Sequence, residues 1–340
     1  MDHALREAID RHLTGAVDGW AALRAAGVAG MIVPEDMGGL GLDLTAPITV
    51  FDAIGRHCIA TPFLETCVIA AWLLQAHRTP AGDATLRAVA EGKTIAVAGL
   101  DPRLRPNVSA SPTAEGWRLD GDALMVLDGA TADHLLVAAR TENYASTLLL
   151  VQPGSDGLLA QSYPTIDGRA AADLRFINVD ATLLATDVDE ALSGAGDIAV
   201  ACLAAEAAGL MRRLVNDTVA YAKEREQFGQ PIAQFQVVQH RLADMHIQAR
   251  RVAAIAARAA HAVDGHWAER ARLASAAKVT AAEAGRFVGQ NAVQLHGGMG
   301  VTQGLAVARC FKRLTVIEHE LGSADQHRQR FARMAAQIAA

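Results

Sequence analysis

Glu224-Arg-Glu-Gln-Phe-Gly-Gln-Pro-Ile-Ala-Gln-Phe-Gln236 is the stretch that decides the fold of this chain, together with a second one, Gln294-Leu-His-Gly-Gly-Met-Gly-Val-Thr302. An isolated copy of the first would be only a helix end closed by glycine, and an isolated copy of the second only a turn. A Rossmann interpretation of the second stretch fails, because a helical pattern precedes it where a strand is required. Their occurrence together, within one helical pattern, indicates a functional site.

The region from about residue 189 onward, which holds both stretches, has the period of helices. Its apolar residues recur at spacings of three and four and form a stripe on each of two long helices. The first stripe consists of Leu242, Met245, Ala249, Val252, Ala256, Ala259 and Val263. The second, rich in small residues, consists of Leu273, Ala277, Ala281, Ala284, Val288, Ala292 and Leu295. Together they predict a four-helix bundle.

The region before it divides into two zones. Residues 1–92 have a helical pattern, broken by the glycine-rich loop Pro34-Glu-Asp-Met-Gly-Gly-Leu-Gly41. Thr61-Pro62 can begin a buried helix over residues 63–74, because Thr caps helices and Pro suits the first helical position. Short apolar runs separated by Pro, Gly, Asp and Asn then predict strands. These runs are 95–100, 123–127, 134–139, 147–152 and 174–179.

The expected fold is therefore α+β and mostly α. It has an N-terminal helical domain (1–92), a middle β-domain (93–187) and a C-terminal helical bundle (188–340). The formal net charge is −6 with both signs scattered, so no basic face for nucleic acid is expected. The four cysteines lack metal-ligand spacing and are expected to be reduced thiols. Charges near the N-terminus and the absence of a long apolar run predict a cytoplasmic protein with no membrane span.

The order of these zones resembles the acyl-CoA dehydrogenases, and the two quoted stretches strengthen the resemblance. The first is similar to that family's R-x-x-F-G-x-x-x-x-x-x-Q segment and the second to its Q-x-x-G-G-x-G segment. The loop at residues 34–41 resembles the family's V-P-E-x-x-G-G-x-G element. The resemblance covers nearly the whole chain and is most specific over residues 221–336.

The resemblance implies FAD as cofactor, contacted from across a subunit interface. A guanidinium can engage a pyrophosphate bidentately, which suits Arg225. Phe228 offers an apolar surface to the adenine, and Gln236 can hydrogen-bond the edge of that base. The remaining cofactor-binding residues carried over from the two segments are Gln227, Gln294, Gly297 and Gly298. Glycines there would let the backbone approach the cofactor closely.

The reaction of the family, α,β-desaturation of an acyl-CoA thioester, needs a carboxylate base for the α-proton. Such a base works best when burial raises its pKa from about 4.3 toward the working pH. The stretch Arg309-Cys-Phe-Lys-Arg-Leu-Thr-Val-Ile-Glu318-His-Glu320 looks like the family's R-D-A-K-x-x-x-I-Y-E-G-T segment. The resemblance makes Glu318 the candidate base, and the alternative is a surface glutamate on a charged helix end. Glu206, close to an A-A-x-A-x-G-like stretch, is a weaker candidate.

Several departures from the family pattern matter. His319-Glu320 replaces Gly-Thr, and the tail over residues 321–328 resembles small subunits of heteromeric dehydrogenases. Val200 or a neighbour replaces an arginine that commonly contacts substrate. In the β-domain Met125 and Leu127 stand where Trp and Thr contact the flavin. There Pro106 replaces Ser. A flavin held mainly by a larger partner subunit is therefore expected.

Three functions follow from the resemblance. The first is an FAD-dependent acyl-CoA dehydrogenase, homo- or hetero-oligomeric, passing electrons to an electron-transfer flavoprotein. The second is a non-catalytic subunit that completes the FAD site of another chain. The third is a flavin monooxygenase on the same fold, for which no glutamate base is needed.

Overall fold

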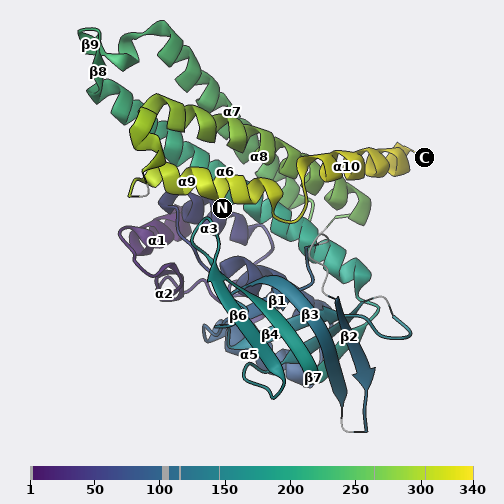
Figure 1. The fold of residues 1–340 in the computed structure, drawn as a ribbon. Coiled ribbons are helices and arrows are strands. Elements are labelled where there is room, and N and C mark those ends of the chain that lie inside the picture. Colours follow the sequence, from purple (N-terminus) through teal and green to yellow (C-terminus); the bar gives the residue numbers. More distant parts are fainter. Residues whose placement is uncertain are drawn as a thin grey trace. The chain divides into compact units, whose positions relative to one another are not determined.

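The computed structural model describes residues 3–101, 107–114, 116–144, 146–263, 265–302 and 304–339. Pro106, one of the predicted departures from the family pattern, lies outside these residues. The fold is the predicted one, mostly α with a β-domain between an N-terminal helical part and a C-terminal bundle (Figure 1). By internal contacts the chain divides into a bundle unit and a sheet unit. The bundle unit comprises residues 1–15, 47–59 and 200–340, and the sheet unit residues 16–46 and 60–199. The boundaries at residues 92 and 187 follow sequence period and stay a prediction.

The N-terminal helices begin where capping residues allow. Asp18 accepts a hydrogen bond from the Ala21 amide at 3.0 Å, and Thr79 accepts one from Gly82 at 3.0 Å ahead of Pro80. These helices are α1 (His3–Leu13), α2 (Gly19–Ala25), η1 (Glu35–Met37), α3 (Ala46–His57), η2 (Leu64–Ala70), α4 (Ala71–Ala76) and α5 (Pro80–Ala90). The predicted helix over residues 63–74 is present as η2 followed by α4, so it begins as a π-helical segment. The predicted start at Thr61-Pro62 is wrong, because η2 begins after Phe63 without a side-chain cap.

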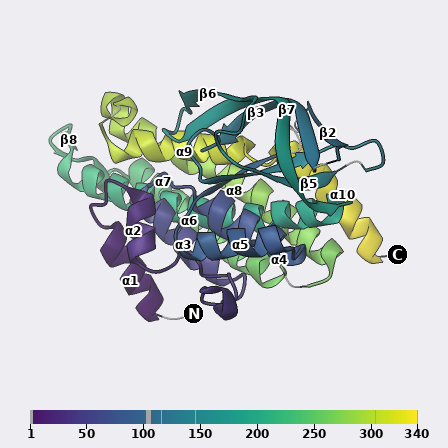
Figure 2. The same ribbon diagram turned by 90° about the horizontal axis from the view of Figure 1, so that it is seen from below.

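The sheet unit holds a curled seven-stranded sheet in the order β1-β4-β5-β7-β3-β2, with β6 paired to β7. Its strands are β1 (Ile95–Ala98), β2 (Asn107–Pro112), β3 (Trp117–Leu127), β4 (His134–Ala139), β5 (Thr147–Val151), β6 (Leu158–Pro164) and β7 (Ala170–Thr186). Strands β1 and β4 pair in parallel, and Ser109 of β2 forms a parallel bridge with Arg140. The β2 strand also bonds the end of β4, where the Ala110 amide donates to the Arg140 carbonyl at 2.7 Å. Figure 2 shows β6, β3, β7 and β2 as one curved layer around an apolar core.

The bundle unit is built from long helices whose small residues allow close packing. Besides α1 and most of α3, it holds α6 (Asp189–Glu224) from residue 200 onward. Its further elements are β8 (Glu226–Gln227), β9 (Gln230–Pro231), η3 (Ile232–Gln234), α7 (Gln236–His261), α8 (Trp267–His296), η4 (Gly297–Val301), α9 (Ala306–His319) and α10 (Ala324–Ala339). Helices α7, α9 and α10 all pack on α8. Both predicted stripes are largely buried. A Cβ on Gly289 would lie 2.8 Å from the Phe311 ring, so glycine sets the separation of α8 and α9.

Candidate functional site

The first motif forms an exposed hairpin at one end of the bundle. Strands β8 and β9 pair through Gln227 and Gln230, and the two residues between them have positive φ angles. Phe228 has φ of 54° and Gly229 of 79°, the conformation of a type I′ turn. The Phe228 side chain is 93% exposed, and its ring meets Phe235 edge-on at 6.1 Å between centroids. A phenylalanine held in this strained conformation with its ring in solvent is a surface prepared for a partner.

The other predicted groups of the first motif also face solvent. Arg225 is exposed at the junction of α6 and the hairpin, where its amide bonds the Tyr221 carbonyl at 2.8 Å. The side-chain amide of the exposed Gln227 donates to the Glu226 carbonyl at 2.8 Å, and Gln236 is the exposed first residue of α7. These side chains are therefore available to a ligand or another subunit.

The second motif ends α8 and forms the turn η4. Gln294, Gly297 and Gly298 are exposed. Gly297 needs glycine because its φ is +59°, and Gly300 needs it because a Cβ would lie 2.6 Å from the Val293 carbonyl oxygen. Gly298 has neither constraint, since its φ is not left-handed and a Cβ would meet open space. Among the described residues, none comes close enough to require glycine at 298, which fits close approach by a cofactor.

A ring stack brings the two motifs together. Tyr221, near the end of α6, stacks on His296, at the end of α8, with 4.4 Å between ring centroids and 24° between planes. His296 is fixed in turn by its Nδ1 contact with the Ala292 carbonyl at 2.8 Å. Tyr221 precedes Arg225 by one helical turn and His296 adjoins Gly297, so this stack joins the helix ends from which the two motifs start.

Glu318 lies buried near the C-terminal end of α9, with 8% of the residue exposed. Arg286 of α8 grips its carboxylate with two donors, Nη2 to Oε1 and Nε to Oε2, the second at 3.3 Å. The Arg286 side chain is 61% exposed, so it can leave Glu318 for solvent. The alternative of a surface glutamate does not describe Glu318, which is a buried carboxylate with a solvent-facing cationic partner.

Lys278 and Arg313 hold the helix end that carries Glu318. Lys278, itself 1% exposed, donates to the carbonyls of Ile317 and Glu320, on either side of Glu318. These are carbonyls that the end of α9 leaves without helical partners, and a cation there also complements the helix dipole. Arg313 donates to the Glu320 carboxylate at 2.9 Å. The backbone around Glu318 is thus fixed from both sides.

Glu206, the weaker candidate base, is held in a different way. It accepts two hydrogen bonds from Arg313, at 2.6 and 2.8 Å, in a bidentate pair. Both side chains are at least nine-tenths buried. Removing one partner of such a pair would leave an uncompensated buried charge. The structure therefore gives Glu206 a structural partner that cannot swing into solvent, unlike the Arg286 partner of Glu318.

The two ends of the candidate site are separated along the helices. Helical rise is about 1.5 Å per residue, so Glu318 lies about 18 Å along α9 from Ala306. Along α8, Arg286 lies about 16 Å from Gly297 by the same rise. Both estimates place the carboxylate well away from the glycine turn. An extended dinucleotide is the kind of ligand that could contact such distant groups.

The β-domain residues predicted to have lost flavin contacts lie at an irregular place in the sheet unit. The register between β3 and β7 shifts between Ala123 and Val126, which leaves Met125 in a bulge with φ of 51°. The Met125 amide donates to Asp173 at 2.8 Å, and Tyr163 donates to the same oxygen at 2.7 Å. Burial, followed by this bond to Asp173, raises the pKa of Tyr163 to about 12. Leu127, half-buried, pairs with Ala171.

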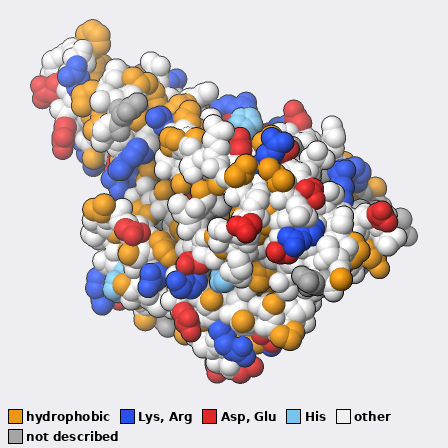
Figure 3. All heavy atoms as spheres, turned by 60° about the horizontal axis from the view of Figure 1, so that its bottom comes forward, with side chains coloured by type: hydrophobic (Ala, Val, Ile, Leu, Met, Phe, Trp, Pro, Cys, Tyr) orange, Lys and Arg blue, Asp and Glu red, His pale blue; other side chains and the backbone are white. Residues whose placement is uncertain are grey.

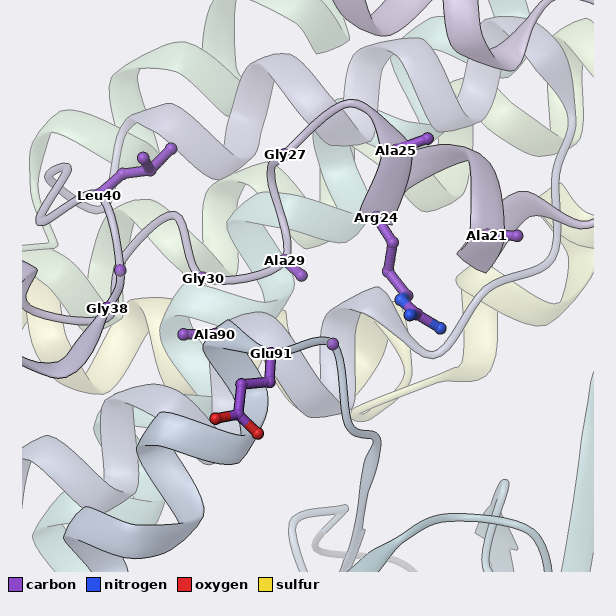
Figure 4. Close-up of a pocket in the computed structure, with 12 residues that line it drawn as sticks. Ala21, Arg24, Ala25, Gly27, Ala29, Gly30, Gly38, Leu40, Ala90 and Glu91 are labelled. Carbon is purple, nitrogen blue, oxygen red and sulfur yellow. The ribbon is translucent and has the colours of Figure 1, made fainter.

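The sheet unit also contains an open pocket of about 490 Å³ beside the 34–41 loop (Figure 4). Its lining is mostly backbone, glycine and alanine, with Arg24 and Glu91 as the charged side chains. The glycines of the loop have a packing reason, since a Cβ on Gly39 would lie 2.0 Å from the Val33 carbonyl oxygen. This loop, quoted for its resemblance, therefore has a structural explanation.

Sequence reasoning missed Arg286, Lys278 and Arg313. Arg286 and Lys278 lie far from Glu318 in sequence and bond Glu318 and the Ile317 carbonyl, and Arg313 bonds the neighbouring Glu320. The available signal was charge inside an otherwise small and apolar helix face at Lys278.

Among the described residues no group of His, Cys, Asp and Glu could hold a metal ion. Nor does any helix in that part of the chain have the length and hydropathy needed to cross a membrane. On the face in Figure 3, acidic and basic side chains are interspersed.

Comparison with known proteins agrees with this architecture. Residues 3–92 match the N-terminal domain of acyl-CoA dehydrogenases and residues 197–337 their C-terminal domain. Acyl-CoA dehydrogenase FadE27 of Mycobacterium tuberculosis is 30% identical, over 99% of this chain and 91% of that protein. Acyl-CoA dehydrogenase IpdE2 of Mycolicibacterium smegmatis is 29% identical, over 91% of this chain and 85% of that protein.

Solved structures show the same likeness. A variant of the Tcur3481-Tcur3483 steroid ACAD superposes with a TM-score of 0.88 and 30% identity, covering 99% of this chain and 98% of that one. The ChsE4-ChsE5 complex of Mycobacterium tuberculosis has a TM-score of 0.87 and 28% identity, over 99% and 98% of the two chains. Matched along nearly its whole length in sequence and fold, the chain belongs to the acyl-CoA dehydrogenase family, whose members are oxidoreductases acting on acyl-CoA.

Proposed function

We propose that this chain takes part in FAD-dependent α,β-desaturation of an acyl-CoA thioester, as a subunit of an oligomer in which Glu318 is the base. The family supports an acyl-CoA oxidoreductase using a flavin. The observation that carries the proposal is the buried carboxylate of Glu318 on a helix end braced by Lys278 and Arg313. A positioned carboxylate of this kind is what proton removal beside a thioester needs.

In the proposed reaction Glu318 removes the α-proton of the thioester. Its carboxylate must first separate from Arg286, whose exposed side chain can turn into solvent. Lys278 keeps the end of α9 in place during that change, because its bonds are to backbone carbonyls on both sides of Glu318. Bound FAD would accept the hydride from the β-carbon at N5 and pass electrons to an electron-transfer flavoprotein.

The two exposed motifs would contact FAD at a subunit interface. Arg225 supplies a free guanidinium for the pyrophosphate, Phe228 an apolar ring and Gln236 an amide. Gln227 and Gln294 add exposed amides, and Gly297 with Gly298 leaves room for close backbone approach. The exposure of all these groups supports an FAD site that is completed by another chain.

Two of the similar solved structures support a bulky thioester substrate and a heteromeric assembly. One similar structure is a steroid ACAD with two differently numbered components, and another is the ChsE4-ChsE5 complex. By that likeness we propose a larger acyl-CoA dehydrogenase subunit as partner and a ring-bearing acyl group as substrate. The chain would act in the cytoplasm.

The decisive experiment replaces Glu318 with Gln in the complex isolated from the native host through a tag on this chain. Gln keeps the size of the side chain but cannot accept the α-proton. We expect acyl-CoA turnover to fall about 10²–10⁴-fold while bound FAD is retained. Turnover is followed with an artificial electron acceptor, and FAD by absorbance.

Glu283→Gln is the matched control, because Glu283 lies exposed on α8 in an ion pair with Arg328. It should leave turnover unchanged. If Glu318→Gln also leaves turnover unchanged, the base lies elsewhere, and the chain is the non-catalytic subunit that completes another chain's FAD site. The Arg286–Glu318 ion pair is the observation that favours this second function, because it occupies the carboxylate.

A further inference from the structure

Two thiols from different parts of the sequence meet inside the bundle unit. Cys58 follows the last residue of α3, and Cys310 lies in the second turn of α9. Their side chains are hydrogen-bonding partners, and neither is in a disulfide. Cys310 is fully buried, whereas Cys58 is only partly buried. Cys58 is therefore the residue of the pair that keeps some surface in solvent, while Cys310 has none.

The backbone at Cys58 is unusual for a residue with a side chain. Its φ is +53°, and its amide donates to the Gly55 carbonyl at 3.1 Å while the Ile59 amide donates to Ile54 at 3.2 Å. This is the left-handed closing position of a Schellman motif, where glycine is strongly favoured. A Cβ there carries a conformational cost. The strained conformation presents the Cys58 thiol to Cys310.

The surroundings of Cys58 favour its thiolate. The hydrogen bond with Cys310 lowers the pKa of the Cys58 thiol, and the guanidinium charges of Arg309 and Arg213 lower it further. Burial and the charge of Glu206 oppose this shift without cancelling it. Arg213 is anchored there, because it donates to Asp217 at 2.6 Å and to the Arg56 carbonyl at 3.4 Å. A partly exposed thiol beside two arginines has the character of a reactive cysteine. The fully buried Cys67 and Cys202 differ, since burial raises the pKa of both.

We infer that Cys58 and Cys310 are a redox-active thiol pair that a low-molecular-weight disulfide oxidises to an intramolecular disulfide. The Cys58 thiolate attacks one sulfur of glutathione disulfide, forms a mixed disulfide and releases one glutathione thiolate. Cys310 then gives its proton to solvent and attacks the Cys58 sulfur, releasing the second glutathione thiolate. Two protein thiols are oxidised, and one glutathione disulfide is reduced to two thiols.

The pair divides these roles by position. Cys58 meets the oxidant because it is the partly exposed thiol, and Cys310 can react only with what Cys58 carries. The hydrogen bond and charge of Cys58 are among the causes that raise the pKa of Cys310. Once Cys58 is in the mixed disulfide that thiolate no longer exists. Arg213, which lowers the pKa of Cys310, then acts with less opposition.

The test treats the full chain with glutathione disulfide and follows its intact mass, with peptide mapping under denaturing, thiol-blocking conditions. The wild-type chain should lose two hydrogen atoms and keep no glutathione, with Cys58 joined to Cys310. Cys310→Ser should instead accumulate one glutathione on Cys58. Cys58→Gly, whose glycine suits the left-handed conformation and preserves the helix end, should react at least about tenfold more slowly than wild type.

Cys202→Ala is the matched control, because Cys202 is fully buried in the same unit. It should form the disulfide at the wild-type rate. Dithiothreitol should reverse the mass change and any rise in Tm that accompanies it. A stable glutathione adduct on wild-type Cys58, reaction of Cys58→Gly at the wild-type rate, or no reaction at all would each overturn the inference. None of these outcomes depends on acyl-CoA turnover.

Discussion

At the residue scale, several residues with bulky side chains adopt the left-handed backbone conformation, which costs conformational energy. Asp, Asn and Gly tolerate positive φ, but Cys58, Met125, Phe228 and Leu321 have side chains that do not. Phe228 is the hairpin tip, Met125 is in the β3 bulge, and Leu321 directly follows the helix end that holds Glu318. Strain of this kind persists only where surrounding structure enforces it. Three of these positions, Cys58, Met125 and Phe228, lie in the regions described above as candidate sites.

Asp128 gives a prediction at this scale. Burial raises the pKa of Asp128, and the charge of Arg169, 3.9 Å away, only partly offsets it. Its φ is +55°, which Asn also tolerates. Asp128→Asn should therefore stabilise the fold at pH 7, by about 1 kcal/mol or less. Urea unfolding of both proteins across pH measures this difference.

The sign of its pH dependence follows from linkage. Since the folded pKa lies above the ordinary value of 3.8, ionised Asp128 costs stability that protonation restores. The advantage of the Asn variant should vanish as the pH falls below about 3.8. An Asn variant that is less stable at pH 7, or equally favoured at every pH, would contradict this account.

At the element scale, sequence period predicted the elements whose residues face a core. The stripe from Met245 to Ala259 lies buried on α7, and His134–Ala139 is a strand with the predicted bounds. Strands β2 and β6 were not predicted. The β6 strand has no buried face, so its sequence lacks the alternation of apolar and polar residues. The sequence of β2, Asn107-Val-Ser-Ala-Ser-Pro112, resembles that of a polar loop. The π-helical segment η2 was also beyond prediction, because its apolar run is the same as that of an α-helix.

The candidate site divides in the same way. Glu318, Arg225 and the glycines could be found by resemblance, because local sequence carries them. The partners of Glu318 could not, since Arg286 and Lys278 meet it only after α8 and α9 pack at the distance that Gly289 sets. Side-chain pairing between helices depends on relative rotation and translation, which no local pattern records.

The docking of α1 on α3 gives a prediction for elements. Asp10 of α1 accepts from Arg56 at 2.7 Å and contacts His57 at 2.9 Å. Burial opposes these bonds, yet together they lower the pKa of Asp10. The Asp10 side chain is 35% exposed, so solvent screening reduces the value of the pair. Asp10→Asn should destabilise the chain at pH 7 by about 1 kcal/mol or less.

This contribution is present above the ordinary pKa of 3.8 and is lost as the pH falls through the lower folded value. The stability difference between Asp10→Asn and wild type should therefore shrink below about pH 3.8. Asp156→Asn, at an exposed turn, is the control and should match wild type throughout. A constant difference at every pH would mean that the charge of Asp10 contributes nothing.

At the scale of the whole molecule, we propose that the chain supplies one side of a shared FAD site. The groups that would hold FAD at the end of the bundle are exposed, while the β-domain has Met125 and Leu127 where the family has flavin contacts. The chain keeps the bundle residues that would contact the FAD of another subunit but lacks the usual β-domain residues that would contact its own. This combination suits an assembly with fewer flavins than subunits. The isolated chain should accordingly bind FAD below one per chain, as measured by absorbance after gel filtration.

Arg225 tests whether this chain completes the flavin site of its partner. Arg225→Ala removes an exposed side chain, so the free energy of unfolding of the isolated chain should change by no more than about 0.5 kcal/mol. In the assembled complex the same change removes a charged hydrogen bond to the pyrophosphate, which is worth about 1.5–3 kcal/mol, and FAD should dissociate about tenfold or more faster. Lys223→Ala, exposed two residues earlier in the last turn of α6, is the matched control. If Arg225→Ala holds FAD as tightly as this control, or if the isolated chain carries a full complement of FAD, the shared site is excluded.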